Sequence, residues 1–600
     1  MKRYISILIV AALTLSLFAC DTENGGKETD ADRTTSQEVT QGSSDSENTS
    51  LESTDAPEET TIEASVATES EESNTEEKED VHAMEYTEYA VNDDKSASYV
   101  LDKAVILKLG YDTAFIDGVR TTFFDKFTSP FVKDGEIYIA LDFAKEQLDL
   151  AVSASETVTN EYGDSFVALS TVKKVYTETF TDSENGIIAI YRDVCPNASE
   201  EYASRMSRLA ANKLALGNTF SAKMVGDRPV LTMTDGMLEL SISKAKSGME
   251  PWASAWEEIS SRAVRLVNTK ASPDTGKSAQ AYRLAACKDM INARYLALAY
   301  LYTEDESYLD AALGYLMAYA EPMLGTDKYL DYSAATTDGQ ADIGLNIAAP
   351  LTTACDVYSL LYTHIDDADK VVFENWVKAE ADLIVKGHKY WIKNKYYGEQ
   401  YGNNHLTSHL MGIIAAAYVL EDDDLLAYAY NSDDNAADLL EMITRAILME
   451  GDEVYKVDTD SDFAVGEIYD RYRVVQNNGF GYSLYHLKFL THCSLMLYNH
   501  GIDTFAYYGE NGEHILLSYL AYADYLIKND ITANGGHYSN DKTMSLESAY
   551  SMYSIAYGIY GDSGISDVIE AFDTRGVKCN ENELFGATTP FLFAYLPDFD

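Results

Sequence analysis

The sequence predicts a mainly α-helical protein, an α/α toroid of stacked helical hairpins preceded by a small α+β module and a disordered acidic linker. Three observations support this prediction. From about residue 200 onward, apolar residues recur at the i, i+3, i+4, i+7 spacing of helices that bury one face. Residues 98–193 contain short β-rich runs separated by turn signals. Residues 21–95 are rich in Ser, Thr, Glu and Asp and nearly free of aromatic residues.

The N-terminus has the pattern of an export signal. Two basic residues precede an apolar run from Ile5 to Ala19, which is too short to span a bilayer as a mature helix. Cys20 follows directly, and this junction resembles a lipobox, although Phe18 is bulkier than the usual residue. We therefore expect a lipoprotein signal peptide over 1–20, with Cys20 lipidated and the protein anchored on the extracellular face of the cell membrane. The alternatives are an ordinary secretory signal or an uncleaved anchor.

The predicted linker covers residues 21–97. Its composition cannot bury enough apolar surface to offset the entropy of the chain, so we expect it to be disordered. Repulsion between its acidic groups would extend it. Behind a lipid anchor, such a segment would act as a stalk.

The overall composition excludes several kinds of function. The chain has 45 basic and 98 acidic residues, a formal net charge of -53, so we expect no nucleic-acid partner. A polyanionic ligand would also be repelled unless the charge is reversed locally. The six cysteines are scattered without CxxC or metal-ligand spacing, so we expect no metal, no other cofactor and no organising disulfide framework. We expect a monomer.

The module at 98–195 is predicted from local patterns. Asp-Gly pairs at 117–118 and 134–135 mark turns, and a helix is predicted over Leu141–Leu148. The β-rich runs that these signals bound lie at 104–109, 135–141 and 186–191.

One segment of this module also carries a family resemblance. The run from Pro130 to Leu148 resembles the N-terminal-like domain of copper amine oxidases. The resemblance covers only about 98–193. It implies an accessory or spacer domain, and it implies neither copper nor oxidase chemistry.

The helical domain is predicted over 200–600. No strict repeat period is present, so a closed toroid is favoured over an open solenoid. The chain has 45 Tyr against 20 Phe, which fits either a carbohydrate cleft or ordinary amphipathic packing. The predicted helices are 253–267, 279–302, 308–320, 343–362, 405–420, 437–449, 481–498, 515–527 and 546–560.

One strip of sequence combines cations with aromatic rings. Four Lys and one His fall within 386–395, interleaved with Tyr and Trp. This combination would suit a polyanionic sugar chain, with cations for its carboxylates and rings for its sugar faces. The alternative is a solvated helix end, where cations are also favoured. The candidate substrate-binding residues in the strip are Lys389, Tyr390, Trp391, Lys395 and Tyr397.

Two polar clusters follow the strip. Asn404 and His405 open an apolar helix, where an Asn near the N-cap also has a purely structural explanation. The second cluster runs from Glu467 to His486 and includes Arg471, Arg473, Tyr482 and Tyr485. It could form an anion site with a proton-transfer group, or it could consist of salt bridges and core tyrosines.

Taken together, these stretches resemble the alginate lyase family of polysaccharide lyases over about 200–530. The motifs agree in order and rough spacing, and the resemblance implies an α/α toroid with a central cleft. The matching motifs are Glu250–Trp256, Ala293–Ala312, Asn403–His405 and Gly481–Leu487.

The resemblance also implies roles for individual residues. Asn404 and His405 match the pair that contacts the uronate carboxylate, and Tyr482 matches the tyrosine that acts as acid, base or both. Both arginines of the second cluster lie further from Tyr482 than the family arginine does. Arg473 is the better match and Arg471 is the alternative. Tyr485 is a second candidate tyrosine and a candidate substrate contact.

Such residues imply β-elimination. Hydrogen bonds and positive charge on the uronate carboxylate stabilise the anion that forms when the C5 proton leaves. A base removes that proton, and an acid protonates the departing O4. A tyrosine has an ordinary pKa of about 10, so a tyrosine base requires neighbouring cations. His405 is the other candidate base.

Two alternatives remain at this level. A glycoside hydrolase on the same toroid would need two carboxylates about 5 to 10 Å apart, and the abundant Asp and Glu neither identify nor exclude such a pair. A surface carbohydrate-binding lipoprotein without activity would fit the altered arginine spacing. The type of uronate polymer and the choice between endo and exo action are not predicted.

Overall fold

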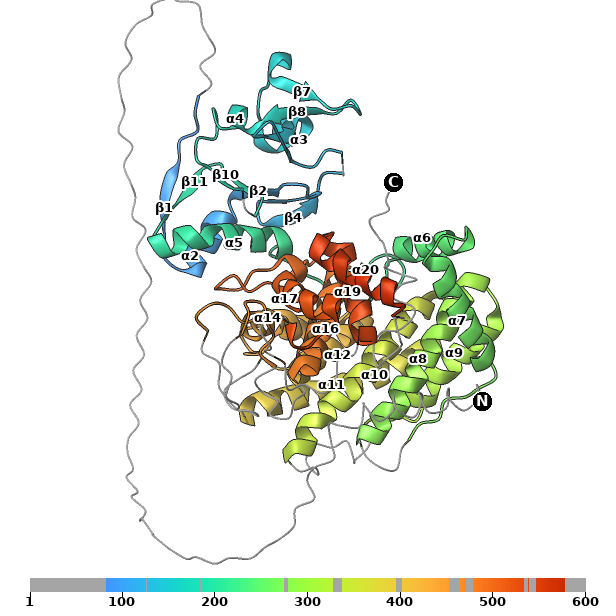
Figure 1. The fold of residues 1–600 in the computed structure, drawn as a ribbon. Helices are drawn as coiled ribbons and strands as arrows, with labels where there is room; N and C mark the ends of the chain where they lie inside the picture. Colours follow the sequence, from blue (N-terminus) through green and yellow to red (C-terminus); the bar gives the residue numbers. More distant parts are fainter. Residues whose placement is uncertain are drawn as a thin grey trace, which may run out of the picture. The chain divides into compact units, whose positions relative to one another are not determined.

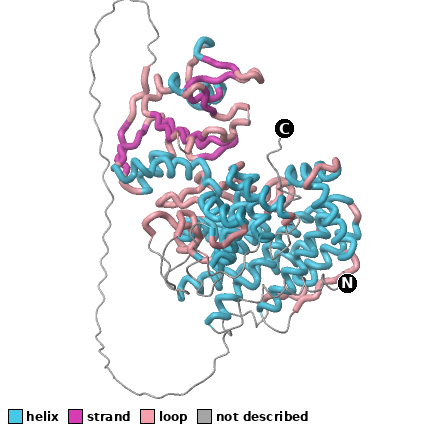
Figure 2. Tube along the Cα trace, in the orientation of Figure 1, coloured by secondary structure: helices cyan, strands magenta, loops and turns pink. Residues whose placement is uncertain are grey.

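The computed structural model describes residues 82–577 with nine internal gaps, and residues Glu79–Asp600 form one compact unit (Figures 1 and 2). Cys20, most of the predicted linker, and the candidates Lys395, Tyr397, Arg471 and Arg473 lie outside the described residues. The gaps are 126, 184, 275–278, 327–336, 395–401, 453–462, 471–478, 534–537 and 539–545.

The β-rich part contains three sheets. β1 and β11 form a two-stranded parallel sheet, and the other two sheets have the orders β4-β3-β2-β10-β9 and β5-β6-β8-β7, antiparallel throughout. The strands are β1 (Thr87–Val91), β2 (Ala104–Lys108), β3 (Thr113–Ile116), β4 (Val119–Thr122), β5 (Phe131–Lys133), β6 (Glu136–Ala140), β7 (Thr157–Thr159), β8 (Ser165–Ala168), β9 (Thr179–Asp182), β10 (Ile187–Tyr191) and β11 (Val194–Ala198).

The central strands β2 and β10 are apolar on both faces, and the structure explains why. Val105 and Leu107 of β2 point into a core shared with α3 (Leu141–Leu148) and the four-stranded sheet, whereas Ile106 joins a second core with α2 (Asp94–Leu101) and α5 (Glu200–Leu216). Because side chains alternate along a strand, a strand buried on both faces has to be apolar at every position.

Both predicted Asp-Gly turns are confirmed. Asp117 and Gly118 join β3 to β4, and Asp134 and Gly135 join β5 to β6, all four with positive φ. This is the two-residue type I′ geometry whose twist matches that of the flanking strands.

The predicted linker boundary at residue 97 is wrong. Residues Thr87–Val91 form β1, which pairs with β11 in register from Thr87–Val194 to Val91–Ala198, and α2 begins at Asp94. Asp93 caps α2 by accepting a hydrogen bond from the Ser96 backbone N–H. The polar composition of this stretch concealed a strand whose last residue, Val91, is buried.

The rest of the described chain is helical, which confirms the predicted fold class of stacked helical hairpins behind a small α+β part. Each of the nine predicted helices is present, with ends shifted by a few residues. After α5 the helices are α6 (Asp235–Lys246), α7 (Trp252–Leu266), α8 (Ala279–Thr303), α9 (Glu306–Ala320), α10 (Thr337–Leu361), α11 (Asp367–Asn394), α12 (Asn404–Leu420), α13 (Asp423–Tyr430), α14 (Leu439–Ala446), α16 (Gly479–Tyr498), α17 (Ile515–Lys528), α19 (Leu546–Tyr560) and α20 (Ser563–Arg575).

The helices pack as neighbours around α10 and α12. α10 contacts α8, α11 and α12, and α12 in turn contacts α11 and α16 (Figure 1). α12 is buried almost all round, from Leu406 to Val419. A helix without a polar face belongs in the centre of a domain, so α12 is an internal element.

Four cysteines, Cys195, Cys287, Cys355 and Cys493, are buried. They lie among apolar neighbours, as predicted for the last three, and Cys579 lies outside the described residues. Within the described part of the chain, no helix has the length and apolarity needed to cross a bilayer.

Candidate active site

The first turn of α12 carries the Asn-His pair. Asn403 is the N-cap, and its side-chain oxygen accepts hydrogen bonds from the backbone N–H groups of His405 (3.0 Å) and Leu406 (3.2 Å). The structural role that Asn404 could have had therefore falls to the preceding residue. Asn404 is the first helical residue and is 7% exposed, and His405 is half-buried.

The N–H groups of the first four helical residues, Asn404 to Thr407, all have acceptors. The Thr407 N–H donates to the Asn403 carbonyl (3.2 Å), and the Asn404 N–H donates to the Asp470 carboxylate (2.6 Å). A bare helix N-terminus binds anions through such groups, but here they are occupied. An anionic ligand would have to be recognised by the side chains of Asn404 and His405.

A short segment before α16 holds Asp470 in place. Ile468 pairs with Ile447 in an isolated antiparallel bridge, and the Tyr469 N–H donates to the Ala446 carbonyl (2.7 Å). Gly466 makes the close approach possible: its φ is +92°, and a Cβ there would lie 2.4 Å from the Leu517 carbonyl oxygen. The segment is therefore fixed by backbone contacts, and Asp470 at its end is fully buried.

α16 brings the tyrosine motif to the same place. Tyr482 lies in the first turn of α16 and is half-buried. His486 follows one turn later on the same helix face, about 6 Å along the axis. Its Nε2 lies 2.7 Å from Thr407 Oγ1 on α12, and its Nδ1 lies 2.7 Å from Asp470 Oδ2. The Asn404–His405 pair and Tyr482 thus start two helices that are bonded to each other beside them.

Tyr485 lies three residues after Tyr482, so the two side chains are about 60° apart around α16. Its ring centroid is 5.9 Å from that of Phe489, one turn further along the helix. Of the two candidate tyrosines, Tyr482 is the one that shares a helix face with His486, which contacts α12.

The cationic strip splits between two faces of α11. Trp391 is 1% exposed and stacks on the His405 ring, with centroids 4.7 Å apart and planes 30° apart. Lys389 is exposed, and its Nζ lies 4.9 Å from the centre of the Tyr428 ring. Tyr390 is half-buried. The strip up to Asn394 is therefore an amphipathic helix end, with rings inside and lysines outside.

A third histidine lies deeper on α11. His388 is fully buried, with Nε2 3.1 Å from Asn435 Oδ1, and its ring centroid is 5.8 Å from that of His409 on α12. Burial lowers the pKa of His388 to about 4. It is therefore neutral at physiological pH and contributes packing, not positive charge.

Sequence reasoning did not identify Asp470 or Thr407 as site residues, and it included His486 only as the last residue of the second polar cluster. The available signal was the spacing of His486 four residues after Tyr482, which places both on one helix face. Nothing in the sequence indicates that Asp470 approaches α12, because that contact depends on the bridge between Ile447 and Ile468.

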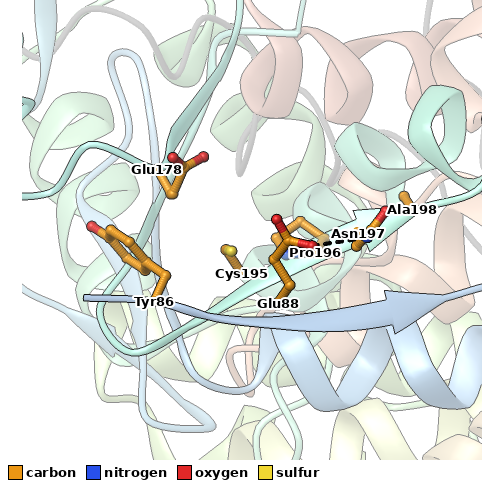
Figure 3. Close-up of a pocket in the computed structure, with 7 residues that line it drawn as sticks. All are labelled: Tyr86, Glu88, Glu178, Cys195, Pro196, Asn197 and Ala198. Atoms are coloured by element: carbon orange, nitrogen blue, oxygen red, sulfur yellow. Dashed lines mark hydrogen bonds between the residues drawn. The ribbon is translucent and has the colours of Figure 1, made fainter. Parts of the chain in front are cut away.

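A separate pocket in the β-rich part does not fit an anionic ligand. It has a volume of about 570 Å³ and lies beside the β1–β11 pair (Figure 3). Its lining includes the carboxylates of Glu88 and Glu178 and the buried Cys195, and Asn197 donates a hydrogen bond to Glu88 (3.0 Å). No lining residue is cationic, so a uronate would be repelled here.

No cluster of three or more potential metal ligands occurs among the described residues. What the arrangement around α12 offers is a side-chain amide, an imidazole and a phenol beside a rigid, buried hydrogen-bonded support. These groups can bind a carboxylate and move a proton.

Comparisons with known proteins show which family this chain resembles. The family model described as alginate lyase matches residues 242–528, slightly less than half of the chain. The predicted resemblance is thereby confirmed over this range, whereas the resemblance of 98–193 to a copper amine oxidase module stays a prediction. A search of curated proteins found no match.

Solved structures of alginate lyases are also similar. The enzyme from Bacteroides ovatus has 13% identity and a TM-score of 0.41, covering 61% of this chain and 99% of its own. Alginate lyase A1-III from Sphingomonas species A1 has 13% identity and a TM-score of 0.41, covering 59% and 94%. A variant of A1-III complexed with tetrasaccharide has 15% identity and a TM-score of 0.42, covering 60% and 94%. Similarities this low transfer no residue role and no substrate.

Proposed function

We propose that this chain is a polysaccharide lyase that cleaves a uronate-containing, anionic polysaccharide by β-elimination. The observation that carries the proposal is the junction of α12 and α16. There, the contact between Thr407 and His486 joins the helix that begins with Asn404 and His405 to the helix that begins with Tyr482. Both motifs lie inside the range matched by the alginate lyase family model.

In this mechanism, Asn404 binds the uronate carboxylate through its side-chain amide and stabilises the anion that forms at C5. Tyr482 or His405 removes the C5 proton, depending on which sugar face carries it, and Tyr482 protonates the departing O4. Arg473, or Arg471 in its place, supplies the positive charge that a tyrosine base needs. No cofactor takes part.

In this proposal, the residues of the strip on α11 have roles other than stacking on sugar rings. Trp391 supports the His405 ring from inside, and Lys389 adds positive charge on the exposed side. We include Tyr390, Lys395, Tyr397 and Tyr485 as proposed substrate contacts.

The hydrolase alternative is not favoured. The two carboxylates described at this site, Glu467 and Asp470, are both fully buried, and Asp470 already has two partners. A glycosidase needs two carboxyl groups that reach the sugar from either side of the scissile bond.

We also propose that the protein is exported, lipid-anchored through Cys20 and monomeric. The support is the signal-like N-terminus and the acidic stretch behind it. Globomycin-type inhibition of lipoprotein signal cleavage, followed by membrane fractionation, would test the anchor.

The test of the reaction is ultraviolet absorbance of residues 82–600 incubated with a panel of polyuronates, since elimination leaves a conjugated C4–C5 double bond. We expect a rise with at least one polymer. Tyr482→Phe should lower the rate by about 10² to 10⁴, the range for loss of a general acid or base. Tyr498→Phe, at the exposed far end of the same helix, is the matched control and should retain activity.

Three outcomes would contradict the proposal or refine it. New reducing ends without absorbance would indicate a hydrolase. Binding without either signal would indicate a carbohydrate-binding lipoprotein. Loss of activity in Tyr485→Phe with activity retained in Tyr482→Phe would move the acid–base role to Tyr485.

A further inference from the structure

We propose that Asp470 is a positioning residue for this reaction, holding the Asn404–His405 pair and the Tyr482 helix in one fixed arrangement. The inference rests on the proposed function and extends it to a residue that does not touch the sugar. Asp470 is fully buried, so it acts only through its neighbours.

The contacts of Asp470 reach both helices at once. Its Oδ2 accepts a hydrogen bond from the Asn404 backbone N–H at 2.6 Å and lies 2.7 Å from His486 Nδ1. Both side chains of the ion-pair contact are 0% exposed. This is a close contact between an imidazole and a carboxylate inside the protein. One oxygen atom therefore joins the start of α12 to α16.

A second series of contacts joins the same two helices, so that the contacts together form a closed ring. His486 Nε2 lies 2.7 Å from Thr407 Oγ1, and the Thr407 hydroxyl is also 3.2 Å from the Asn403 carbonyl. The ring thus runs from Asp470 to His486, to Thr407, and back along the first turn of α12 to Asn404. Both paths end within three residues of His405, while His486 lies one helical turn from Tyr482.

This closed ring distinguishes Asp470 from an ordinary helix cap. Asp438 provides the comparison: it is 3% exposed and accepts backbone hydrogen bonds from Ser432 (2.7 Å) and Glu441 (2.9 Å) at the start of α14. Asp438 stabilises one helix end, whereas Asp470 connects two helices that carry different parts of the site. Substituting either should destabilise the fold, but only Asp470 should affect the geometry of the reaction.

The experiment compares Asp470→Asn with Asp438→Asn in kcat, KM and melting temperature. Both variants should melt at a lower temperature. Asp470→Asn retains an acceptor for the Asn404 N–H but removes the negative charge from the contact with His486, so kcat should fall about 10- to 100-fold with KM changed much less, as for a small misplacement of reacting groups. Asp438→Asn should keep the wild-type kcat.

Thr407→Val provides a second variant that leaves the buried carboxylate in place. It removes the hydroxyl that contacts His486 and so interrupts the closed ring of contacts. Thr407→Val should therefore also lower kcat, but by less than Asp470→Asn does. A wild-type kcat and KM in both Asp470→Asn and Thr407→Val would overturn the proposal.

A measurement that needs no catalytic activity can test the positioning role of Asp470 independently of the proposed reaction. The chain has ten histidines, and the His405 ring stacks on Trp391, so its ring resonances in histidine-labelled protein should be displaced by the indole. Asp470→Asn should shift them and Asp438→Asn should not. If wild-type protein cleaves no polyuronate but this difference is found, the positioning role stands and the lyase proposal fails. Unchanged His405 resonances in Asp470→Asn would reject the positioning role.

Discussion

At the scale of single residues, the orientation of His405 depends on Trp391. The indole is almost completely buried and covers one face of the imidazole, so it sets the plane in which the His405 nitrogens lie. Aromatic contacts of this kind are worth about 0.5 to 1.5 kcal/mol beyond the buried area. Trp391 therefore contributes to the proposed reaction by positioning the His405 ring.

We predict that Trp391→Leu lowers kcat/KM about tenfold through loss of this support. Trp376 is the matched control: it lies on the same helix, is 2% exposed, and donates its indole N–H to the Leu324 carbonyl (2.6 Å). Trp376→Leu should lower the free energy of unfolding by a similar amount, about 2 to 3 kcal/mol. Equal losses of kcat/KM in both variants, measured beside urea unfolding, would show that Trp391 acts through stability alone.

The roles of Asn404, His405 and Tyr482 stay a prediction. The structure shows that the helices they begin are joined by the contact between Thr407 and His486, whereas the strip on α11 was predicted as one surface. Because α11 turns through about 100° per residue, Trp391 faces the core while Lys389, two residues earlier, faces solvent. Burial on one side of a helix can be assigned only when its neighbours are known.

At the scale of elements, α11 shows where helix prediction from periodicity fails. Its buried positions include Phe373, Trp376, Ile384 and Trp391, at helical spacing, but they are interspersed with charged residues such as the buried Glu380. The apolar helix α12 and the long helix α8 were predicted almost to the residue. α5, α6, α11, α13 and α20 were not predicted, because their apolar stripes are narrow or short.

The contact between α11 and the start of α14 makes stability depend on pH. Burial lowers the pKa of His388 to about 4, against an ordinary value of about 6.5. The unfolded chain therefore binds the proton first as the pH falls. The contribution of neutral His388 is complete above about pH 6.5 and is lost as the pH falls towards 4.

We predict that wild-type protein loses about 2 kcal/mol more unfolding free energy than His388→Gln between pH 7 and pH 4.5. Glutamine keeps a donor for Asn435 without titrating in this range. Denaturant unfolding at the two pH values measures the difference. His82→Gln, at an exposed position, should behave as wild type, and parallel pH dependence in the His388 variant would refute the prediction.

At the scale of the whole molecule, an acidic enzyme has to bind an acidic polymer. With a formal net charge of -53, the long-range field repels a polyuronate, and only local cations such as Lys389 oppose it. The Debye length falls from about 30 Å at 0.01 M salt to about 8 Å at 0.15 M. Screening therefore removes the repulsion before it removes contacts within the site.

We predict that kcat/KM for the polymer rises several-fold between these two salt concentrations, mainly through a lower KM. The same measurement with a short uronate oligomer should show a weaker rise, because fewer charges are brought to the surface. A steady fall of kcat/KM with salt would mean that local cations dominate the encounter.

The buried cysteines have a consequence for how this protein matures. Burial raises the pKa of Cys195, Cys355 and Cys493, so these thiols remain protonated, and only a thiolate attacks disulfides or oxidants readily. For a chain proposed to act outside the cell, folding of the described part then requires no oxidase or disulfide isomerase. Among the described residues, these three positions should also offer no reactive sulfur for crosslinks between molecules.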